Sequence, residues 1–294
     1  MIVAPRPSFD WNLRTRSLRL GTRTLLVGVV NITPDSFSDK GKFFTTESAV
    51  GHALQLVEDG ADILDLGGES TRPGTRPAVS IEEELDRLLP VMEAVLRERP
   101  GAVISIDTYK STTARAAIAA GAEIVNDVSG FLWDDAMAST CAELGCGVVL
   151  MHTRGRPDEW RTQPPLAHDA VVPLVLRELQ ERADAALNAG VRHECIILDP
   201  GFGFGKVGDE NYPLLAHLDA LHALGYPILA GTSRKSFLGK TLATIYGHAV
   251  APDQRGNATL ASITAAVLAG AHLVRVHDVR SAREAVAIAD AIRG

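Results

Sequence analysis

Residues 103–127 read VISIDTYKSTTARAAIAAGAEIVND, and this stretch decides the fold. The apolar run Val103–Ile106 ends at Asp107, a helical pattern follows, and a second apolar run ends at Asn126. Strands that alternate with helices predict a parallel sheet. Because parallel strands end at the same edge of a sheet, we expect the polar residues after such runs to lie close together.

The same unit of apolar run, polar stop and helical pattern recurs along the whole chain. The eight runs are Leu25–Val30, Asp62–Leu66, Val103–Ile106, Glu123–Val125, Val148–Met151, Ile196–Leu198, Ile228–Ala230 and Leu273–Val276. Eight units predict an α/β fold with a single (β/α)8 TIM barrel, whose active sites lie at the carboxyl ends of the strands. We expect a hairpin extension over residues 1–23 and the barrel over 24–294.

Composition narrows the functional classes. A formal net charge of −7 argues against non-specific binding to nucleic acid. No apolar stretch approaches the roughly 20 residues that span a bilayer, and residues 1–6 lack the apolar core of a signal peptide. Cys141, Cys146 and Cys195 lack zinc-site spacing, so we expect buried thiols. The expectation is a cytoplasmic protein without membrane or nucleic-acid partners.

Some helices and loops can be placed from the sequence. Ser80 with Glu83 predicts an N-cap and capping box, and Val171–Leu187 and Thr259–Leu268 are predicted helices. Three segments are longer than the roughly 2–6 residues usual for loops in this fold, namely 32–46, 67–79 and 153–165. Long loops on the catalytic face are candidate lids or substrate clamps.

Three strand ends carry side chains that suit a planar heterocycle. Asp107, Asn126 and Asp199 follow the third, fourth and sixth apolar runs. Carboxylates accept N–H groups, and an amide both donates and accepts, so the set can hold an amino-pyrimidinone edge. The alternative is that each side chain caps the helix that follows it. Three such residues together favour a binding site.

Two later loops also point to a ligand. Residues 199–206 alternate glycines with Phe202 and Phe204, which predicts backbone shaped around an aromatic ligand and one ring lining it. The alternative is a tight turn with a core phenylalanine. Lys235, after the seventh run, can act as a Schiff-base nucleophile or as a charged donor. We favour the donor, because nothing nearby in the sequence marks Lys235 as desolvated.

The last strand predicts an anion site. Arg275 and His277 are two positions apart, so strand alternation places both on one face. Burying them is costly without an anion, and barrels of this type often bind phosphate near the seventh and eighth strands. For His277 alone, the alternative is a helix cap. Polar residues of the first two loops that can reach the same rim are Asn31, Ser70, Thr71 and Arg72. A diphosphate bridged by Mg²⁺ suits this group, because Mg²⁺ relies on substrate phosphates and few protein ligands.

These motifs resemble one family, the dihydropteroate synthases, over about residues 24–293. The matching segments are residues 28–39 (GVVNITPDSFSD), 67–74 (GGESTRPG), 106–108 (IDT), 126–130 (NDVSG), 199–206 (DPGFGFGK), 233–236 (SRKS) and 275–279 (RVHDV). Each segment alone is modest evidence. Their order, each at a strand end, makes the resemblance highly specific.

The resemblance implies a transferase of folate biosynthesis. It would join 4-aminobenzoate to 7,8-dihydropterin-6-ylmethyl diphosphate and give 7,8-dihydropteroate and diphosphate. The implied mechanism is dissociative: diphosphate leaves, the dihydropterin stabilises the exocyclic cation, and the arylamine attacks. The implied cofactor is Mg²⁺ at Asn31, and the implied assembly is a homodimer.

The resemblance also implies a role for each matching residue. The residues expected to hold the pterin are Asp107, Asn126, Asp199 and Lys235, with Phe204 as a further lining. Those expected at the diphosphate are Asn31, Thr71, Arg275 and His277. Those expected to border the aminobenzoate are Ser236, Arg72, Pro73, Phe37 and the stem of Lys235. The expected catalytic residues are Asp107, Lys235, Arg275 and His277.

The sequence departs from the family pattern at two positions. Lys40 stands where a second glycine is common and can stiffen the first loop or add charge, and Thr153 replaces a frequent methionine with little expected effect.

Two rival functions are open to a chain with these motifs. A pterin-barrel methyltransferase would share the pterin residues but bind no diphosphate, so Thr71-Arg72 with Arg275 and His277 argue against it. A catalytically silent pterin-binding paralogue is disfavoured by the complete set of site residues.

Overall fold

Eight parallel strands form the centre of the molecule. The computed structural model describes residues 5–33, 46–70, 79–160 and 162–294. The strands run in the order β8-β7-β6-β5-β4-β3-β10-β9. Their bounds are β3 Leu25–Asn31, β4 Ile63–Gly67, β5 Ile104–Asp107, β6 Ile124–Asp127, β7 Gly147–Met151, β8 Ile196–Asp199, β9 Leu229–Ala230 and β10 Leu273–Val276.

The sheet closes on itself between β8 and β9. A parallel bridge pairs Leu198 with Ile228, and the Leu198 N–H donates to the Pro227 carbonyl at 3.0 Å. Pairing of β10 with both β3 and β9 completes the circuit. The predicted (β/α)8 barrel is therefore confirmed. Closure also brings the carboxyl ends of all eight strands to one rim.

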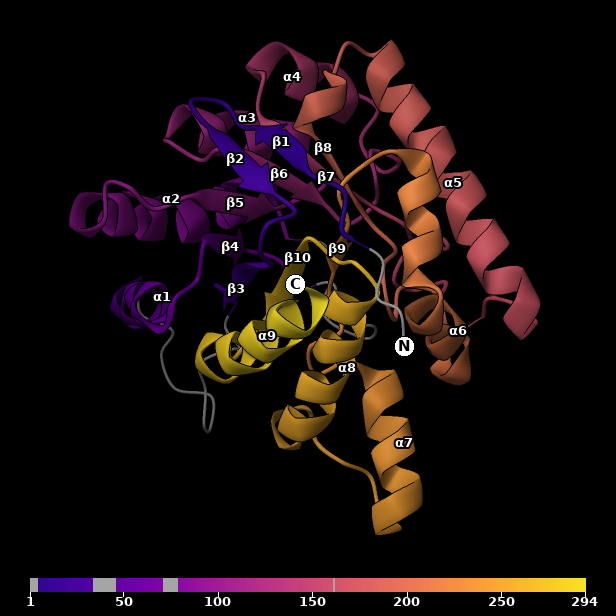
Figure 1. The fold of residues 1–294 in the computed structure, drawn as a ribbon. Coiled ribbons are helices and arrows are strands. Elements are labelled where there is room, and N and C mark those ends of the chain that lie inside the picture. The colour runs from indigo at the N-terminus through magenta and orange to yellow at the C-terminus, as the bar shows by residue number, and fades with distance from the viewer. Residues whose placement is uncertain (1–4, 34–45, 71–78, 161) are drawn as a thin grey trace.

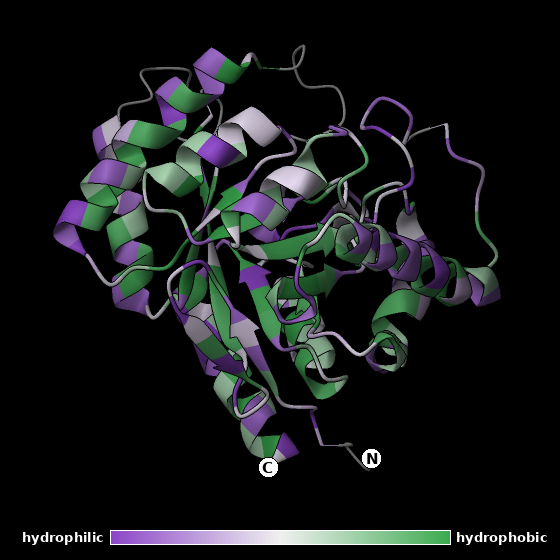
Figure 2. Cartoon of the chain, turned by 90° about the horizontal axis from the view of Figure 1, so that it is seen from above, coloured by the Kyte–Doolittle hydropathy of each residue, from purple (hydrophilic) through white to green (hydrophobic). Residues whose placement is uncertain are grey.

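Helices surround the barrel and cover its outer surface (Figure 1). Their bounds are α1 Thr46–Asp59, α2 Ile81–Glu98, α3 Ser111–Ala119, α4 Met137–Leu144, α5 His168–Asn188, α6 Asn211–Ala216, α7 Ser236–Tyr246, α8 Gly256–Leu268 and α9 Val279–Arg293. Figure 2 shows apolar strands at the centre and polar residues on the outward helix faces. Burial of that interface is the main stabilising term for such a fold.

A hairpin covers the amino-terminal end of the barrel. Strands β1 (Phe9–Asn12) and β2 (Ser17–Leu20) pair antiparallel. Trp11 packs with the inward residues at the strand starts, and its indole N–H donates to the Cys195 carbonyl at 2.8 Å. The hairpin expected before the barrel is thus present and seals its floor.

The predicted helix cap, helices and buried thiols are present in the structure. Ser80 caps α2, with its Oγ accepting the Glu83 N–H at 3.1 Å. The predicted helices 171–187 and 259–268 correspond to α5 and α8. All three cysteines are free and buried, as expected. Among the helices of the described ranges, none is both long and apolar enough to cross a membrane.

Candidate active site

A cavity of about 660 Å³ opens at the carboxyl ends of the strands. Its walls come from residues that follow β3, β4, β5, β7, β8, β9 and β10. The predicted site residues that line it are Asn31, Asp107, Phe204, Lys235, Ser236, Arg275 and His277. Ser70 lines it too. Thr71, Arg72, Phe37, Pro73 and Lys40 lie outside the described residues.

Arg275 meets two carboxylates of the protein itself. Its Nε donates to Asp65 Oδ2 at 2.6 Å, and its Nη2 donates to Asp107 Oδ2 at 2.7 Å. Burial opposes the charge on Arg275, but Asp65 and Asp107 together raise its pKa above the ordinary value. The idea that burial of Arg275 requires an external anion is therefore incomplete. The two pairs fix the guanidinium plane at the cavity wall.

Asp65 is a site residue that the sequence argument missed. It lies in the middle of β4 with no solvent exposure. Besides Arg275 it accepts Ser105 Oγ–H at 2.6 Å and Asn126 Nδ2–H at 3.0 Å. The sequence feature that could have identified it is an aspartate inside the apolar run Ile63–Gly67. Because a buried carboxylate almost always has polar partners, such a residue predicts a charged network.

Asn126 and Asp199 lie just behind the cavity wall. Asn126 is nearly buried and is held by Asp65. Asp199 Oδ2 lies 3.8 Å from where a Cβ on the cavity-lining Gly231 would stand, and the Arg275 Cβ lies 3.9 Å from the same point. Asp199 Oδ1 accepts the Gly201 N–H at 2.7 Å, which fixes its carboxylate plane. The structure thus brings Asp107, Asn126 and Asp199 around one part of the barrel mouth.

The carboxylates at this rim are hard to ionise. Burial raises the pKa of Asp107, and the Arg275 guanidinium offsets only part of that rise. Burial also raises the pKa of Asp199, which the Gly201 N–H and the Lys235 ammonium oppose. Strongly raised carboxyl pKa values beside fixed cations in a cavity are typical of functional sites.

His277 is oriented by Ser233. The Ser233 Oγ lies 2.9 Å from His277 Nδ1 and also accepts the His277 backbone N–H at 3.3 Å. The two contacts engage Nδ1 and the backbone N–H of His277 and so fix the orientation of the imidazole ring. His277 lines the cavity next to Arg275.

Phe204 provides an aromatic surface between two loops. The Lys235 Nζ lies 3.8 Å from the Phe204 ring centroid, and Trp160 packs edge-on against the same ring at 5.0 Å. Phe202 is instead a core residue with 1% exposure. The alternatives left open for the two phenylalanines are thereby resolved by placement. Trp160, another missed lining residue, donates its indole N–H to Thr153 Oγ1 at 3.0 Å.

A buried Lys206 forms part of the cavity floor. Its Nζ lies 2.9 Å from Nδ1 of the fully buried His152 and donates to the Phe204 carbonyl at 3.2 Å. Burial lowers the pKa of Lys206 well below its usual range, and burial with the nearby Lys206 does the same for His152. In the sequence, His152 directly follows the fifth apolar run and Lys206 ends the segment 199–206, and neither was assigned a role. They support the loop that carries Phe204.

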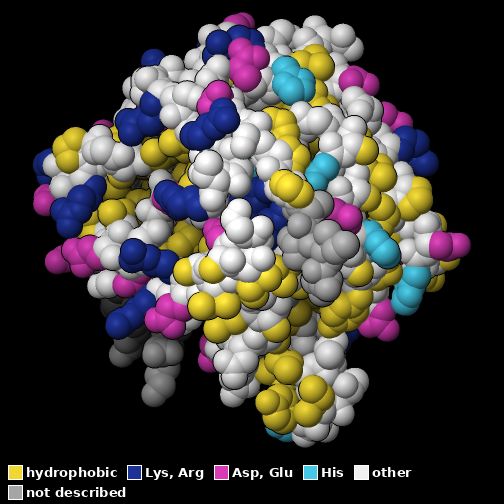
Figure 3. Space-filling model, viewed as in Figure 1, with side chains coloured by type: hydrophobic (Ala, Val, Ile, Leu, Met, Phe, Trp, Pro, Cys, Tyr) yellow, Lys and Arg dark blue, Asp and Glu magenta, His cyan; other side chains and the backbone are white. Residues whose placement is uncertain are grey.

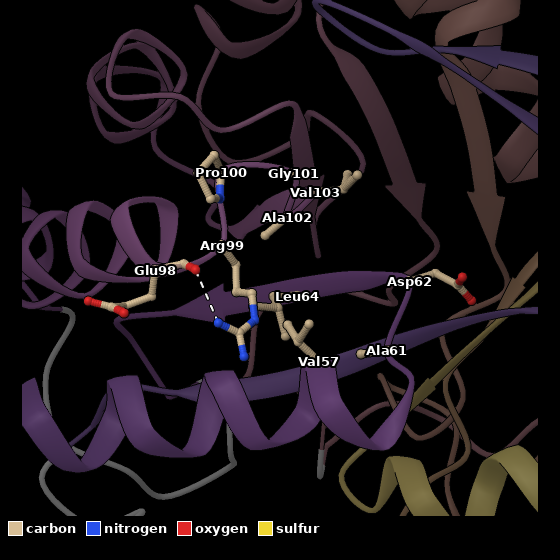
Figure 4. Close-up of a pocket in the computed structure, with 10 residues that line it drawn as sticks. All are labelled: Val57, Ala61, Asp62, Leu64, Glu98, Arg99, Pro100, Gly101, Ala102 and Val103. Carbon is tan, nitrogen blue, oxygen red and sulfur yellow. Dashed lines mark hydrogen bonds between the residues drawn. The ribbon is translucent and has the colours of Figure 1, made fainter.

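A smaller cavity at the other end of the barrel is a packing gap. It measures about 300 Å³ and lies beside the starts of β4 and β5 (Figure 4). Arg99 at its edge donates to the Glu98 carbonyl at 3.1 Å and pairs with Glu58 at 3.2 Å. Asp62 is paired with Arg23. Arg99 and Asp62 therefore already have partners within the protein. The cavity lies at the amino-terminal end of the barrel, where residues serve stability and not catalysis.

Comparison with known proteins agrees with this geometry. The model of the pterin binding enzyme family matches residues 27–277. The dihydropteroate synthase of Bacillus subtilis is 41% identical over 270 residues, which cover 92% of this chain and 89% of that protein. A solved dihydropteroate synthase from Xanthomonas albilineans with 4-aminobenzoic acid has 42% identity and a TM-score of 0.87, covering 98% of this chain and 99% of its own.

A second structure from the same source matches equally fully. The Xanthomonas albilineans dihydropteroate synthase in complex with 7,8-dihydropteroate has 41% identity and a TM-score of 0.82 over 98% of this chain and 99% of its own. Likeness of this extent, over both sequence and fold, establishes the family. The chain belongs to the dihydropteroate synthase family of pterin-binding enzymes.

Proposed function

We propose that this chain joins 4-aminobenzoate to 7,8-dihydropterin-6-ylmethyl diphosphate and releases 7,8-dihydropteroate and diphosphate. The observation that carries the proposal is one cavity lined by Asp107, Arg275 and His277, with the amide of Asn126 and the carboxylate of Asp199 just behind its wall. Asp107, Asn126 and Asp199 suit the N–H edge of a pterin. Arg275 and His277 suit the anion that leaves.

The pterin end is assembled from Asp107, Asn126, Asp199 and Lys235. Asp199 is held in plane by the Gly201 N–H and offers its second oxygen to the ligand. Phe204 gives the ring system an apolar face, with the Lys235 Nζ beside it. A solved relative with 7,8-dihydropteroate bound supports this use of the site.

The diphosphate end uses Arg275 and His277, with Asn31 as a further contact; Thr71, which the family resemblance also assigns here, lies outside the described residues. Two carboxylates hold the Arg275 guanidinium and Ser233 orients the His277 ring, so neither has to reorganise as charge builds on the leaving oxygen. Asn31 ends β3 and lines the cavity with an amide group, a ligand type that Mg²⁺ accepts. Within the described part of the chain, no cluster of three or more His, Cys, Asp or Glu forms a metal cage. Asn31 would hold a Mg²⁺ ion that takes its other ligands from diphosphate and water, and the ion would offset the charge of the leaving group.

The aminobenzoate end lies at the start of α7. Ser236 is the first residue of that helix and lines the cavity. Helix N-termini favour anions, so Ser236 can receive the carboxylate while the stem of Lys235 packs against the ring. Arg72, Pro73 and Phe37, which the family resemblance assigns to this border, lie outside the described residues. A solved relative with 4-aminobenzoic acid supports 4-aminobenzoate as the second substrate.

The reaction follows from positioning and charge. The bond between the exocyclic carbon and the diphosphate oxygen breaks, and its electron pair goes to the diphosphate. The dihydropterin delocalises the positive charge left on carbon, and Asp107 with Asp199 keeps the ring in place. The arylamine lone pair then forms the C–N bond, and the nitrogen loses one proton. Holding both reactants in line supplies much of the rate enhancement.

Diphosphate release tests the proposed function. Purified protein is mixed with the pterin diphosphate, 4-aminobenzoate and Mg²⁺, and diphosphate and dihydropteroate are measured together. Equimolar formation of both products is expected, with little diphosphate when 4-aminobenzoate is left out. Methyl transfer from a methylated pterin, or no product at all, would contradict the proposal.

We also propose that the protein forms a homodimer. Four large apolar side chains are strongly exposed on two of the last helices, Ile245 and Tyr246 on α7 and Ile288 and Ile292 on α9. Figure 3 shows hydrophobic side chains gathered over this part of the surface. Exposed apolar patches of this kind favour association. Light scattering should give twice the 31.3 kDa chain mass, and glutamate at Ile288 should lower it.

A further inference from the structure

The turn between β9 and α7 contains strained backbone. Arg234 has φ +59°, a left-handed conformation that is uncommon for any residue but glycine. The Lys235 N–H donates to the Thr232 carbonyl at 3.3 Å, so Arg234 is the third residue of this turn, where glycine is favoured when φ is positive. Strain of this kind persists only where the surrounding structure enforces it.

Helix α8 and the residue before it enforce the turn from both sides of Arg234. The Arg234 N–H donates to Thr259 Oγ1 at 3.0 Å. Its carbonyl accepts Arg255 Nη1–H at 2.8 Å. Two residues before Arg234, Thr232 is also bonded to α8, because Ser262 Oγ donates to Thr232 Oγ1 at 2.8 Å. Both polar groups of the strained residue are thus bonded to neighbouring elements.

A glycine of α7 makes room for the Arg255 side chain. A Cβ built on Gly239 would lie 2.5 Å from Arg255 Nε and 2.6 Å from Cζ. The guanidinium fits against this bare stretch of helix and also donates to the Val250 carbonyl through Nε at 3.1 Å and Nη2 at 2.7 Å. Any larger side chain at Gly239 must therefore shift the Arg255 guanidinium from this position, from which it donates to the Arg234 carbonyl.

We propose that Arg255, Thr259 and Gly239 are positioning residues that hold Arg234 in its left-handed conformation and so aim Lys235 and Ser236 into the cavity. The two aimed residues follow Arg234 directly, and the Lys235 Nζ reaches the Phe204 ring 3.8 Å away. Relaxation of Arg234 to negative φ would redirect the chain that enters α7. The inference rests on the proposed function for the roles of Lys235 and Ser236.

Gly239→Ala tests this positioning role of Arg255 without replacing any residue that lines the cavity. Displacing Arg255 should lower kcat/KM about tenfold or more and weaken binding of a simple pterin, because the part-buried Arg234 carbonyl loses its donor. Gly51→Ala is the matched control: it also lies within a helix, α1, and its Cβ would meet nothing within 4 Å. The control should keep wild-type kcat/KM.

Thr259 gives a second test with its own rescue. Thr259→Val keeps the shape but removes the hydroxyl, and kcat/KM should again fall about tenfold, whereas Thr259→Ser should restore it. Thr264→Val is the control on the same helix, because its hydroxyl bonds only within α8, to the Leu260 carbonyl. In an Arg234→Gly background, Thr259→Val should have a smaller effect, since glycine adopts positive φ without steric cost.

The crystal structure of Thr259→Val separates this inference from the proposed function. It should show negative φ at Arg234 and Lys235 displaced from Phe204, a result that needs no turnover. If the wild type makes no dihydropteroate, the proposed function fails. The φ angle at Arg234 and the pterin affinity of the variants still show whether Arg255, Thr259 and Gly239 hold Arg234 in place. Two results together would overturn the positioning proposal. Arg234 would keep positive φ in Thr259→Val, and both Gly239→Ala and Thr259→Val would have pterin affinity and kcat/KM within twofold of their controls.

Discussion

Arg275 Nε lies 2.6 Å from Asp65 Oδ2, although the two residues are 210 positions apart in the chain. The contact crosses between β10 and β4, the two neighbours of β3 in the barrel. Asp65 also accepts a hydrogen bond from Asn126, and Arg275 also donates one to Asp107. The pterin residues and the diphosphate residues are therefore parts of one charged network.

Asp65→Asn should damage both the fold and the site. The substitution leaves a buried guanidinium with one carboxylate fewer, which we expect to cost about 3–5 kcal/mol in the free energy of unfolding. Urea denaturation measures it. Asp10→Asn is the control, because the Asp10–Arg19 pair is more than half exposed on both sides and should contribute at most about 1 kcal/mol. Equal small effects at both positions would show that Asp65 is not the centre of the network.

Asp199→Asn should weaken pterin binding with little loss of stability. Asparagine keeps the oxygen that accepts the Gly201 N–H but replaces the other acceptor with a donor facing the pterin N–H edge. A buried mismatch costs about 1–3 kcal/mol, so affinity for a pterin should fall at least about tenfold. Isothermal calorimetry decides the matter, and unchanged affinity would remove Asp199 from the pterin site.

Pterin affinity should fall as the pH is lowered through about 6. Burial raises the folded-state pKa of Asp199 to about 6, above its unfolded value. Protonated Asp199 therefore stabilises the folded, unliganded protein at low pH, and this contribution to the free energy of unfolding is lost as the pH rises through 6. A bound pterin that donates to the carboxylate favours the ionised form, so binding near pH 6 should release protons. Calorimetry in two buffers of different ionisation enthalpy measures that release. Asp199→Asn should reduce the release without abolishing it, because Asp107, whose pKa burial raises to about 7, remains in the site.

Arg275→Ala should impair diphosphate departure more than pterin binding. Losing one preorganised charge donor costs about 10²–10³ in rate. The variant also leaves Asp65 and Asp107 unpaired, so Arg275→Lys is needed beside it, since lysine restores the charge but not the planar two-sided contact. Both should release diphosphate more slowly, with lysine intermediate. Wild-type release from Arg275→Ala would refute the anion-site assignment.

The sequence predicted the barrel and most of the cavity because strand ends are legible as polar stops after apolar runs. Asp107, Lys235 and Arg275 were found in this way and do line one cavity. Asp65 was missed because it lies within a strand, where alternation alone does not reveal which side chain is paired. Trp160 was missed because a loop residue has no periodicity to place it. The strain at Arg234 depends on contacts from α8, which no local pattern encodes.

The most direct measurement of the central claim is the crystal structure of this chain with the pterin diphosphate and Mg²⁺ bound. The account predicts the pterin ring against Asp107, Asn126 and Asp199, and the diphosphate against Arg275 and His277. A ligand bound in the reverse direction, or a diphosphate far from Arg275 and His277, would contradict it.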